Sequence, residues 1–309
     1  VDRLLPDRGR PAGCLVSSGR RNRRTSEMNE PKRIRILDIS DLLIWFHAFV
    51  TAIRRPRAVN YRLQLIWNNK RFRRLRLQFL SEVTGADPKQ VAQYIEEVEA
   101  DHQLIRSVRT AYRRWTRYIP LPTDFMVDQS GSTMFFHAVS LYAFVRLMRP
   151  EIIVETGGTP GKSSAFILRA LDRNQRGHLY TIDLPPPEIR TRRLASTSMT
   201  PSARPAGAPS NWAVPEWLRS RQTLILQPAQ QALPRLLKEL GSISLFIHDS
   251  DHSYSHMRWE LETVYPYLQP GGFIWCDDVT TNTAWSDFCE SKGLDHWEFT
   301  SQGVARRDS

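Results

Sequence analysis

The chain has 309 residues, of which 41% are apolar and 24% are charged; this composition is ordinary for a globular protein and excludes a fibrous one. The net charge is +11. The three cysteines, Cys14, Cys276 and Cys289, are too few and too scattered for a disulfide framework or a zinc site. We therefore expect a protein of the reducing cytoplasm, with one α/β domain and a smaller accessory region.

The positive charge is concentrated before Pro150, where the net charge is roughly +13, against roughly −2 in the rest of the chain. Such a field suits an anionic partner, which could be nucleic acid or a membrane surface. A solvated, arginine-rich helical surface explains it equally well. Residues 1–35 are arginine-rich, lack the apolar segment of a secretory signal and are expected to be disordered. Translation could begin at Val1 or at Met28.

Residues 36–132 are predicted to form a helical accessory region, and residues 133–309 the main domain. The apolar run Leu42–Ile53 is too short to span a bilayer, so a buried helix is favoured over an interfacial membrane helix. Asp87 followed by Pro88 indicates a helix N-cap and a first helical residue. A further helix is predicted from about Thr133 to Met148.

After Pro150, short apolar segments alternate with helical ones, which is typical of a mostly parallel sheet covered by helices on both faces. The final segment HWEFTSQGVARR alternates like an antiparallel strand pair. The expected parallel strands lie at 152–154, 178–182, 222–226, 243–247 and 273–276, and the helices at 163–171, 232–240 and 255–267.

Residues 185–215 form a long stretch that is rich in Pro, Ser, Thr, Arg and Ala and lacks apolar periodicity. A loop of this length inside a compact domain is usually functional or disordered. We expect a lid over the site, in preference to a plain surface insertion.

A glycine-bearing turn connects the first predicted strand to the next helix in the segment IIVETGGTPGKSS, residues 152–164. Glycines let the backbone approach a ligand, and a helix N-terminus offers free N–H groups to an anion. The ending Gly161-Lys162-Ser163 imitates a phosphate-binding P-loop, but Thr156 occupies the position where that motif needs its first glycine. The glycine spacing also fails the G-x-G-x-x-G pattern of dinucleotide-binding proteins.

Glu155, Gly157, Gly161 and Ser163 form a Glu-x-Gly-x-x-x-Gly-x-Ser pattern. It resembles the first motif of class I S-adenosylmethionine methyltransferases, in the variant of catechol-type and macrolide-sugar O-methyltransferases. The resemblance implies a Rossmann-like, seven-stranded sheet, with these four residues at the cofactor and Ser163 bonded to its carboxylate. In that family an acid at the end of the second strand binds the ribose hydroxyls, and Asp183 occupies this place; a carboxylate can accept from both hydroxyls of a diol.

Carboxylates also follow two later strands, with Asp249 after one and Asp277 and Asp278 after the next. Ligands of parallel sheets bind outside the carboxyl ends of the strands, so these acids are expected to converge. Converging carboxylates repel one another unless a cation lies between them, and oxygen ligands suit Mg²⁺ or Ca²⁺.

The region from about Leu141 to Asp287 resembles macrolide-sugar O-methyltransferases and the related cephalosporin-biosynthesis proteins. The resemblance implies that Asp249, Asp277 and Asp278 are metal ligands and that His252 is the general base. Related enzymes often carry Glu-Asp or Asp-Asn in place of Asp277-Asp278. The metal would lower the pKa of the acceptor hydroxyl, and His252, with Asp249 as its catalytic neighbour, would take the proton.

The sequence thus predicts an S-adenosylmethionine-dependent methyltransferase that is assisted by a divalent metal, Mg²⁺ foremost. The acceptor is expected to be a hydroxyl of a small molecule, a sugar or a secondary metabolite, and the chain could form a homo-oligomer. Two alternatives stay open: a non-catalytic module that binds through the basic N-terminal half, and a P-loop-like protein that binds a nucleoside triphosphate.

Overall fold

The computed structural model describes residues 73–115, 136–185 and 207–308 of the chain. The predictions for residues 1–35, for Met28 and for the apolar run Leu42–Ile53 lie outside these residues. Among the described helices, none has both the length and the apolar character that a membrane crossing requires.

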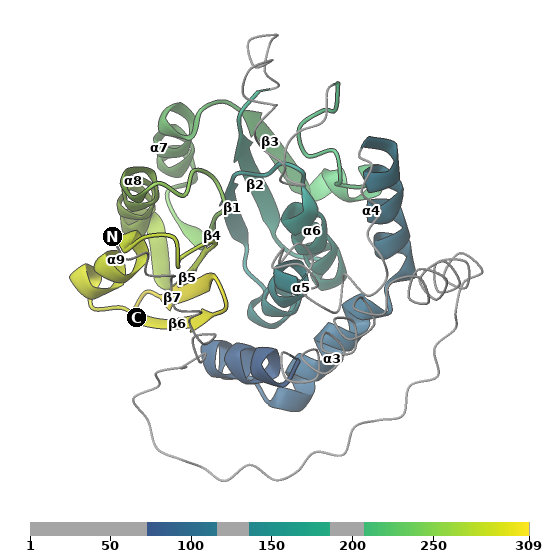
Figure 1. The fold of residues 1–309 in the computed structure, drawn as a ribbon, viewed down its shortest axis with the longest axis horizontal. Coiled ribbons are helices and arrows are strands. Elements are labelled where there is room, and N and C mark those ends of the chain that lie inside the picture. Colours follow the sequence, from purple (N-terminus) through teal and green to yellow (C-terminus); the bar gives the residue numbers. More distant parts are fainter. Residues whose placement is uncertain (1–72, 116–135, 186–206, 309) are drawn as a thin grey trace, which may run out of the picture.

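A seven-stranded sheet with the order β3-β2-β1-β4-β5-β7-β6 forms the centre of the fold (Figure 1). Strands β1 to β5 are parallel, and β7 pairs antiparallel with both β5 and β6. The predicted Rossmann-like α/β fold is therefore confirmed. The strand bounds are β1 Ile152–Thr156, β2 His178–Asp183, β3 Gln222–Leu226, β4 Ile243–His248, β5 Leu268–Cys276, β6 Asp295–Phe299 and β7 Gln302–Arg306.

Helices cover both faces of the sheet because neighbouring strand residues point to opposite sides. Ile153, Leu245 and Ile247 pack in one apolar cluster with helices α5 and α6, whereas Val154 and Phe246 pack in a second cluster with α7, α8 and α9. These helices span α5 Phe136–Met148, α6 Lys162–Asn174, α7 Ala229–Leu240, α8 Tyr254–Val264 and α9 Ala284–Lys292, with short 3₁₀ helices η2 Glu216–Arg221 and η3 Tyr265–Tyr267.

One strand is longer than its sequence predicted. The segment Pro270-Gly271-Gly272 reads as a turn before the strand, but β5 already begins at Leu268. The extension pairs with the chain end: the N–H of Gly271 donates to the carbonyl of Arg307, and the N–H of Arg307 donates to the carbonyl of Gly272, both at 2.9 Å. Gly271 adopts a φ of 72°, which a glycine accommodates within the paired segment.

The described part of the N-terminal region is helical, with a helix over 73–84 followed by α3 (Pro88–Glu99) and α4 (His102–Trp115). The predicted cap of α3 is present, because the side chain of Asp87 accepts from the N–H of Lys89 at 2.7 Å. These helices share one apolar cluster with α5, α6 and the sheet. Residues 73–115 therefore pack onto the main domain through a common core.

Two buried contacts show how closely the helices are joined to the sheet. Phe79, from the helix over 73–84, stacks on Phe299 of β6 with ring centroids 5.3 Å apart and meets Trp275 of β5 edge-on at 6.0 Å. Arg169 of α6 forms an ion pair of 2.6 Å with Asp101, which also caps α4 by accepting from the N–H of Leu104.

The described end of the predicted lid, residues 207–214, packs against the glycine turn. Asn211 is fully buried there; its side chain donates to the carbonyl of Gly158 at 2.5 Å and accepts from Gln222 at 2.6 Å. The N–H of Ala213 donates to the carbonyl of Pro160 at 2.8 Å. This part of the 185–215 stretch is therefore a buried support of the turn, and residues 186–206 lie outside the described structure.

Candidate active site

The glycine turn lies at the carboxyl end of β1 and packs directly on the end of β4. Gly157 has a φ of 85°, and a Cβ added to it would lie 1.7 Å from the carbonyl oxygen of Asp249. Gly161 has a φ of 93°, and its Cβ would meet Val214 and Asn211 at about 3 Å. Both glycines are thus required by backbone conformation and by close packing, in addition to any ligand that they cradle.

Glu155 is completely buried beneath this turn. Its carboxylate accepts from the hydroxyls of Ser163 and Ser164, both at 2.5 Å, and of Thr181 at 3.1 Å. Burial raises the pKa of Glu155, and the three hydroxyl donors oppose that rise. In this structure the Ser163 proton is donated to Glu155, so its contact with a cofactor carboxylate would require the hydroxyl to change partners.

Asp183 lies at the end of β2, where the sequence placed a ribose-binding acid. One carboxylate oxygen accepts from the hydroxyl of Thr159, and the other accepts from the N–H of Leu184 at 2.8 Å. Thr159 belongs to the glycine turn, so the acid and the turn are hydrogen-bonded to each other. This arrangement presents a carboxylate beside the turn, as a diol-binding site requires.

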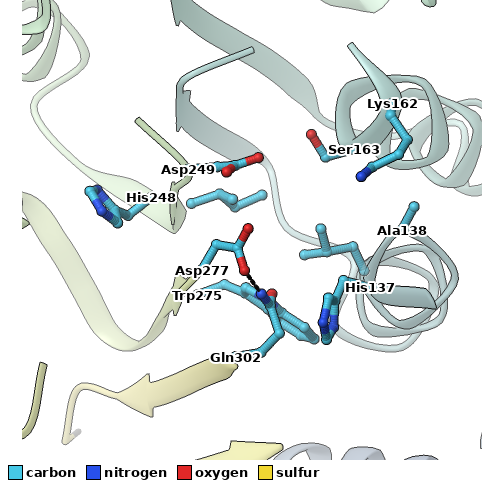
Figure 2. A pocket seen from close by; sticks show the side chains of 11 residues that line it. His137, Ala138, Lys162, Ser163, His248, Asp249, Trp275, Asp277 and Gln302 are labelled. Atoms are coloured by element: carbon cyan, nitrogen blue, oxygen red, sulfur yellow. Dashed lines mark hydrogen bonds between the residues drawn. The ribbon is translucent and has the colours of Figure 1, made fainter. Parts of the chain in front are cut away.

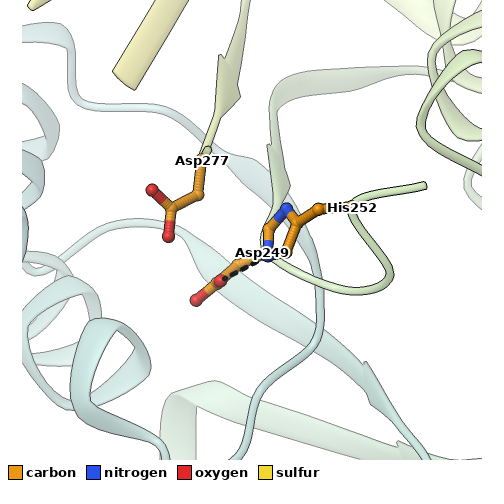
Figure 3. Close-up of side chains that lie close together, drawn as sticks. All are labelled: Asp249, His252 and Asp277. Atoms are coloured by element: carbon orange, nitrogen blue, oxygen red, sulfur yellow. Dashed lines mark ion pairs between the residues drawn. The ribbon is translucent and has the colours of Figure 1, made fainter. Parts of the chain in front are cut away.

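Asp249, His252 and Asp277 come together at the ends of β4 and β5 (Figure 3). Each offers one ligand atom, and these atoms lie within 4.8 Å of one another. The structure thus brings together two of the three predicted metal ligands with the predicted base. Asp278 is outside this group; it lies beyond the end of β5 and has a φ of 52°.

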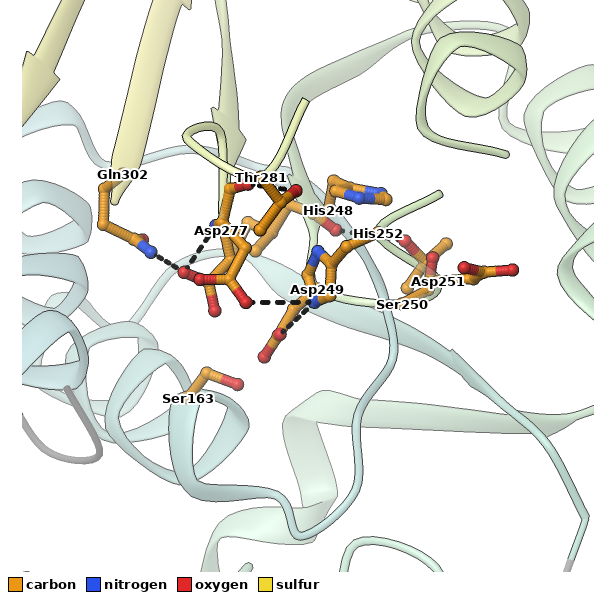
Figure 4. Close-up of polar contacts among 12 residues, drawn as sticks. Ser163, His248, Asp249, Ser250, Asp251, His252, Asp277, Thr281 and Gln302 are labelled. Atoms are coloured by element: carbon orange, nitrogen blue, oxygen red, sulfur yellow. Dashed lines mark hydrogen bonds and ion pairs between the residues drawn. The ribbon is translucent and has the colours of Figure 1, made fainter. Parts of the chain in front are cut away.

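His252 occupies the centre of the acidic residues (Figure 4). Its Nε2 lies 3.8 Å from a carboxylate oxygen of Asp249 and 3.8 Å from one of Asp278. Both distances exceed hydrogen-bonding length, so neither carboxylate fixes the Nε2 proton.

Asp277 is held firmly, since one of its carboxylate oxygens accepts from the side chain of Gln302 and from the N–H of Asp278 at 2.8 Å. Gln302 in turn accepts from the indole N–H of Trp275. The pKa of Asp249 is raised well above the usual range by burial and by the neighbouring charge of Asp277. The pair therefore favours an added positive charge.

A pocket opens between α5, α6 and the ends of β4, β5 and β7 (Figure 2). The side chain of Lys162 extends into it from the start of α6, toward Asp249 and Asp277. Burial lowers the pKa of Lys162, and the two carboxylates raise it. His137 also lines the pocket, and burial lowers its pKa to about 3, which keeps its ring neutral.

Several of these residues were missed by reasoning from sequence. Lys162 attracted notice only as part of a P-loop imitation, and Gln302 carried no signal in an ordinary terminal strand. His248 did carry one, because a polar residue inside the apolar run LFIH, directly before Asp249, calls for a buried partner. That partner is Glu260 of α8, 2.7 Å from the Nδ1 of His248.

Residues 154–279 match a family model described as a methyltransferase domain. No curated protein sequence matches the chain. The O-methyltransferase TomG from Streptomyces achromogenes, solved with SAM, is 15% identical and has a TM-score of 0.40; the match covers 68% of this chain and 91% of TomG.

Two further solved structures are similar to the chain. Podospora anserina PaMTH1, bound to SAH, is 16% identical over 72% of this chain and 95% of its own, with a TM-score of 0.44. MycE of the mycinamycin biosynthetic pathway, solved with Mg and SAH, is 14% identical over 65% of this chain and 54% of its own, with a TM-score of 0.40.

Residues 154–279, which match the methyltransferase domain, lie within the seven-stranded sheet and its helices. The matched residues include the glycine turn, Asp183, the Asp249–His252 loop and the Asp277-Asp278 pair. The prediction of a methyltransferase is confirmed for the domain over residues 154–279.

Proposed function

We propose that the protein transfers the methyl group of S-adenosylmethionine to a hydroxyl of a small-molecule acceptor, with a divalent cation at its acidic cluster. The observation that carries this proposal is the direct packing of the glycine turn on Asp249, where a Gly157 Cβ would be 1.7 Å from the Asp249 carbonyl. It makes the methyl-donor turn and the acidic cluster neighbours, as methyl transfer to a bound hydroxyl requires.

The methyl donor would lie on the turn from Gly157 to Gly161, with Asp183 accepting from its ribose hydroxyls. The free N–H groups at the start of α6, where Gly161 is the N-cap without a side-chain cap, suit the donor's carboxylate.

The donor set at the acidic cluster fits a divalent cation. Asp249 and Asp277 offer carboxylate oxygens that are close enough to share one ion. Bound there, a cation such as Mg²⁺ would lower the pKa of the acceptor hydroxyl. Asp278, 3.8 Å from His252, would complete the acidic surroundings.

His252 would act as the general base. Its Nε2 faces the cluster without a hydrogen-bonding carboxylate, so it can accept the hydroxyl proton. The acceptor oxygen then forms a bond to the donor's methyl carbon while the bond from that carbon to sulfur breaks, which releases S-adenosylhomocysteine. The proton ends on His252, and the charges balance.

The acceptor is proposed to be a sugar or a hydroxylated secondary metabolite, and the protein a cytoplasmic homo-oligomer. Arg106, Arg113 and Arg114 are exposed on α4, where an anionic partner or membrane surface would bind. We retain residues 133–309 as the cofactor-binding domain, with residues 73–115 as its helical cover.

Isothermal titration calorimetry tests the cofactor assignment. The protein should bind S-adenosylhomocysteine, and Asp183→Asn should weaken that affinity about tenfold because it removes a charged acceptor for the ribose hydroxyls. Binding of ATP in place of S-adenosylhomocysteine would overturn the proposal and favour a nucleotide-binding protein. Asp249→Ala should leave the affinity for S-adenosylhomocysteine within about threefold of the unmodified protein while it abolishes Mn²⁺ binding.

A further inference from the structure

Glu260 is a buried carboxylate that lies behind the acidic cluster and outside the proposed reaction. It belongs to α8, and its side chain is fully shielded from solvent. One oxygen accepts from the hydroxyl of Thr156 and from Nδ1 of His248, both at 2.7 Å. The other accepts from Ser250 and from Nε2 of His256, both at 3.0 Å.

The four hydrogen-bond donors explain how the negative charge of Glu260 is tolerated on the buried side of α8. Burial alone would raise the pKa of Glu260, but the hydrogen bonds from His248 and His256 outweigh it and lower the pKa to about 2. The side chain is therefore an anion whose lone pairs are all used. A buried charge satisfied in this way is rigid, because losing any partner leaves polar atoms unpaired.

Three of the four donors belong to the two segments that meet at the site. Thr156 is the last residue of β1, directly before Gly157. His248 and Ser250 stand on either side of Asp249. The backbone joins the same two segments, since the N–H of Asp249 donates to the carbonyl of Thr156 at 3.0 Å. Glu260 thus bonds both strands at the point where the turn touches the acidic loop.

His248 extends this connection to His252. Because the carboxylate of Glu260 can only accept, Nδ1 of His248 carries a proton in this hydrogen bond. The Nε2 of His248 is buried and has no hydrogen-bond partner among the described residues. The ring meets that of His252 edge-on, with centroids 5.4 Å apart and an interplanar angle of 88°. The orientation that Glu260 gives His248 therefore defines the surface against which His252 rests.

We infer that Glu260, acting through His248 and Ser250, is the positioning residue that fixes Asp249 and His252 relative to the glycine turn. This inference rests on the proposed function, because it assigns Glu260 to the cation cluster of the same site. Glu260 itself touches neither the cluster's ligand atoms nor the turn's glycines in any described hydrogen bond. Its effect would be transmitted through the groups on either side of Asp249.

The chain supplies a matched control in His256. It also donates to Glu260, at 3.0 Å, but it lies on α8 and its other ring nitrogen contacts Gln230, away from the cluster. His256→Ala therefore removes one hydrogen bond from the same carboxylate without disturbing Thr156, His248 or Ser250. If Glu260 had only a structural role, His256→Ala and a substitution of Glu260 or His248 would have similar effects on Mn²⁺ affinity.

The test measures Mn²⁺ affinity of the full chain by electron paramagnetic resonance, with melting temperatures recorded for every variant. Glu260→Gln should weaken Mn²⁺ binding about tenfold to a hundredfold, as the loss of a group that orients ligands does, whereas His256→Ala should stay within about twofold. His248→Ala provides a second route if Glu260→Gln fails to fold. His248→Asn should recover most of the affinity, because its amide N–H can replace Nδ1 as the donor to Glu260.

The inference is overturned if Glu260→Gln, or His248→Ala in its place, binds Mn²⁺ as tightly as the unmodified chain. It is also overturned if His256→Ala weakens binding equally, or if the unmodified chain takes up no Mn²⁺, since no cation cluster would then be positioned. Binding of S-adenosylhomocysteine is measured separately. Its absence would defeat the proposed methyl transfer while the Mn²⁺ comparison still decides the role of Glu260.

Discussion

The α-carbon of Gly157 lies so close to the carbonyl of Asp249 that a methyl group on it would be 1.7 Å from the oxygen. The glycine turn and the acidic loop are therefore in van der Waals contact through their backbones. Neither can shift without the other, which gives the proposed site a fixed geometry before any ligand binds.

Gly157→Ala should reduce the free energy of unfolding by about 3 kcal/mol or more, because it combines a positive φ with a steric clash. Gly271→Ala is the control: its φ is 72° against 85° for Gly157, but nothing lies within 4 Å of its Cβ position. This control should lose only about 1 kcal/mol. Urea denaturation of both variants measures the difference, and equal losses would show that the contact with Asp249 is unimportant.

Asn211→Gly should weaken S-adenosylhomocysteine binding about tenfold and leave Mn²⁺ affinity unchanged. The substitution keeps the φ of 57° accessible but removes the hydrogen bonds to Gly158 and Gln222 that support the turn. Calorimetry with each ligand separates the two effects. If both affinities fell together, the segment 207–214 would support the whole site and not the turn alone.

Lys162→Gln should strengthen Mn²⁺ binding by about tenfold, because the ammonium of Lys162 points at the same carboxylates that would hold the cation. Lys238→Gln, on the surface of α7, changes the net charge equally and should have no effect. Titrations at two salt concentrations test the prediction. Weaker binding in the Lys162 variant would mean that the lysine holds the carboxylates in place.

The free energy of unfolding should decrease as the pH is lowered because of His137, whose pKa in the folded state, about 3, lies below its ordinary value of 6.5. Between these values the unfolded chain binds a proton that the folded chain does not, so this contribution is complete above pH 6.5 and is lost as pH falls toward 3. The loss is about 1.4 kcal/mol per pH unit. His137→Gln should flatten this part of the curve, whereas replacing the exposed His102 in the same way should not.

Much of the fold could be predicted because short apolar runs bounded by Gly, Pro and polar residues mark buried strands. Ile243–His248 is such a run, and its bounds were predicted to within one residue. The start of β5 was missed, since Pro270 and two glycines resemble a turn and their pairing with Arg307 depends on the distant chain end. Local patterns do not contain that information.

The site was predictable where residue type and strand end coincide, as at Asp249 and Asp277. It was not predictable where function depends on which side of a helix faces inward. Glu260 lies in a helix of mixed polarity, WELETV, where an inward carboxylate and an exposed one look alike in sequence. Asp278 was predicted as a metal ligand together with Asp277, but it lies 3.8 Å from His252 without belonging to the group of ligand atoms formed by Asp249, His252 and Asp277.

The stacking of Phe79 on Phe299 has a consequence for how the chain is made. The two residues lie near opposite ends of the described sequence. The helix over 73–84 therefore gains its aromatic partner only when β6 has been synthesised. At about 5–20 residues per second, that interval is on the order of 10 to 45 seconds. During translation Phe79 therefore lacks its stacking partner until nearly the whole described chain has been made, whereas α3 and α4 can already pack on α5 and α6.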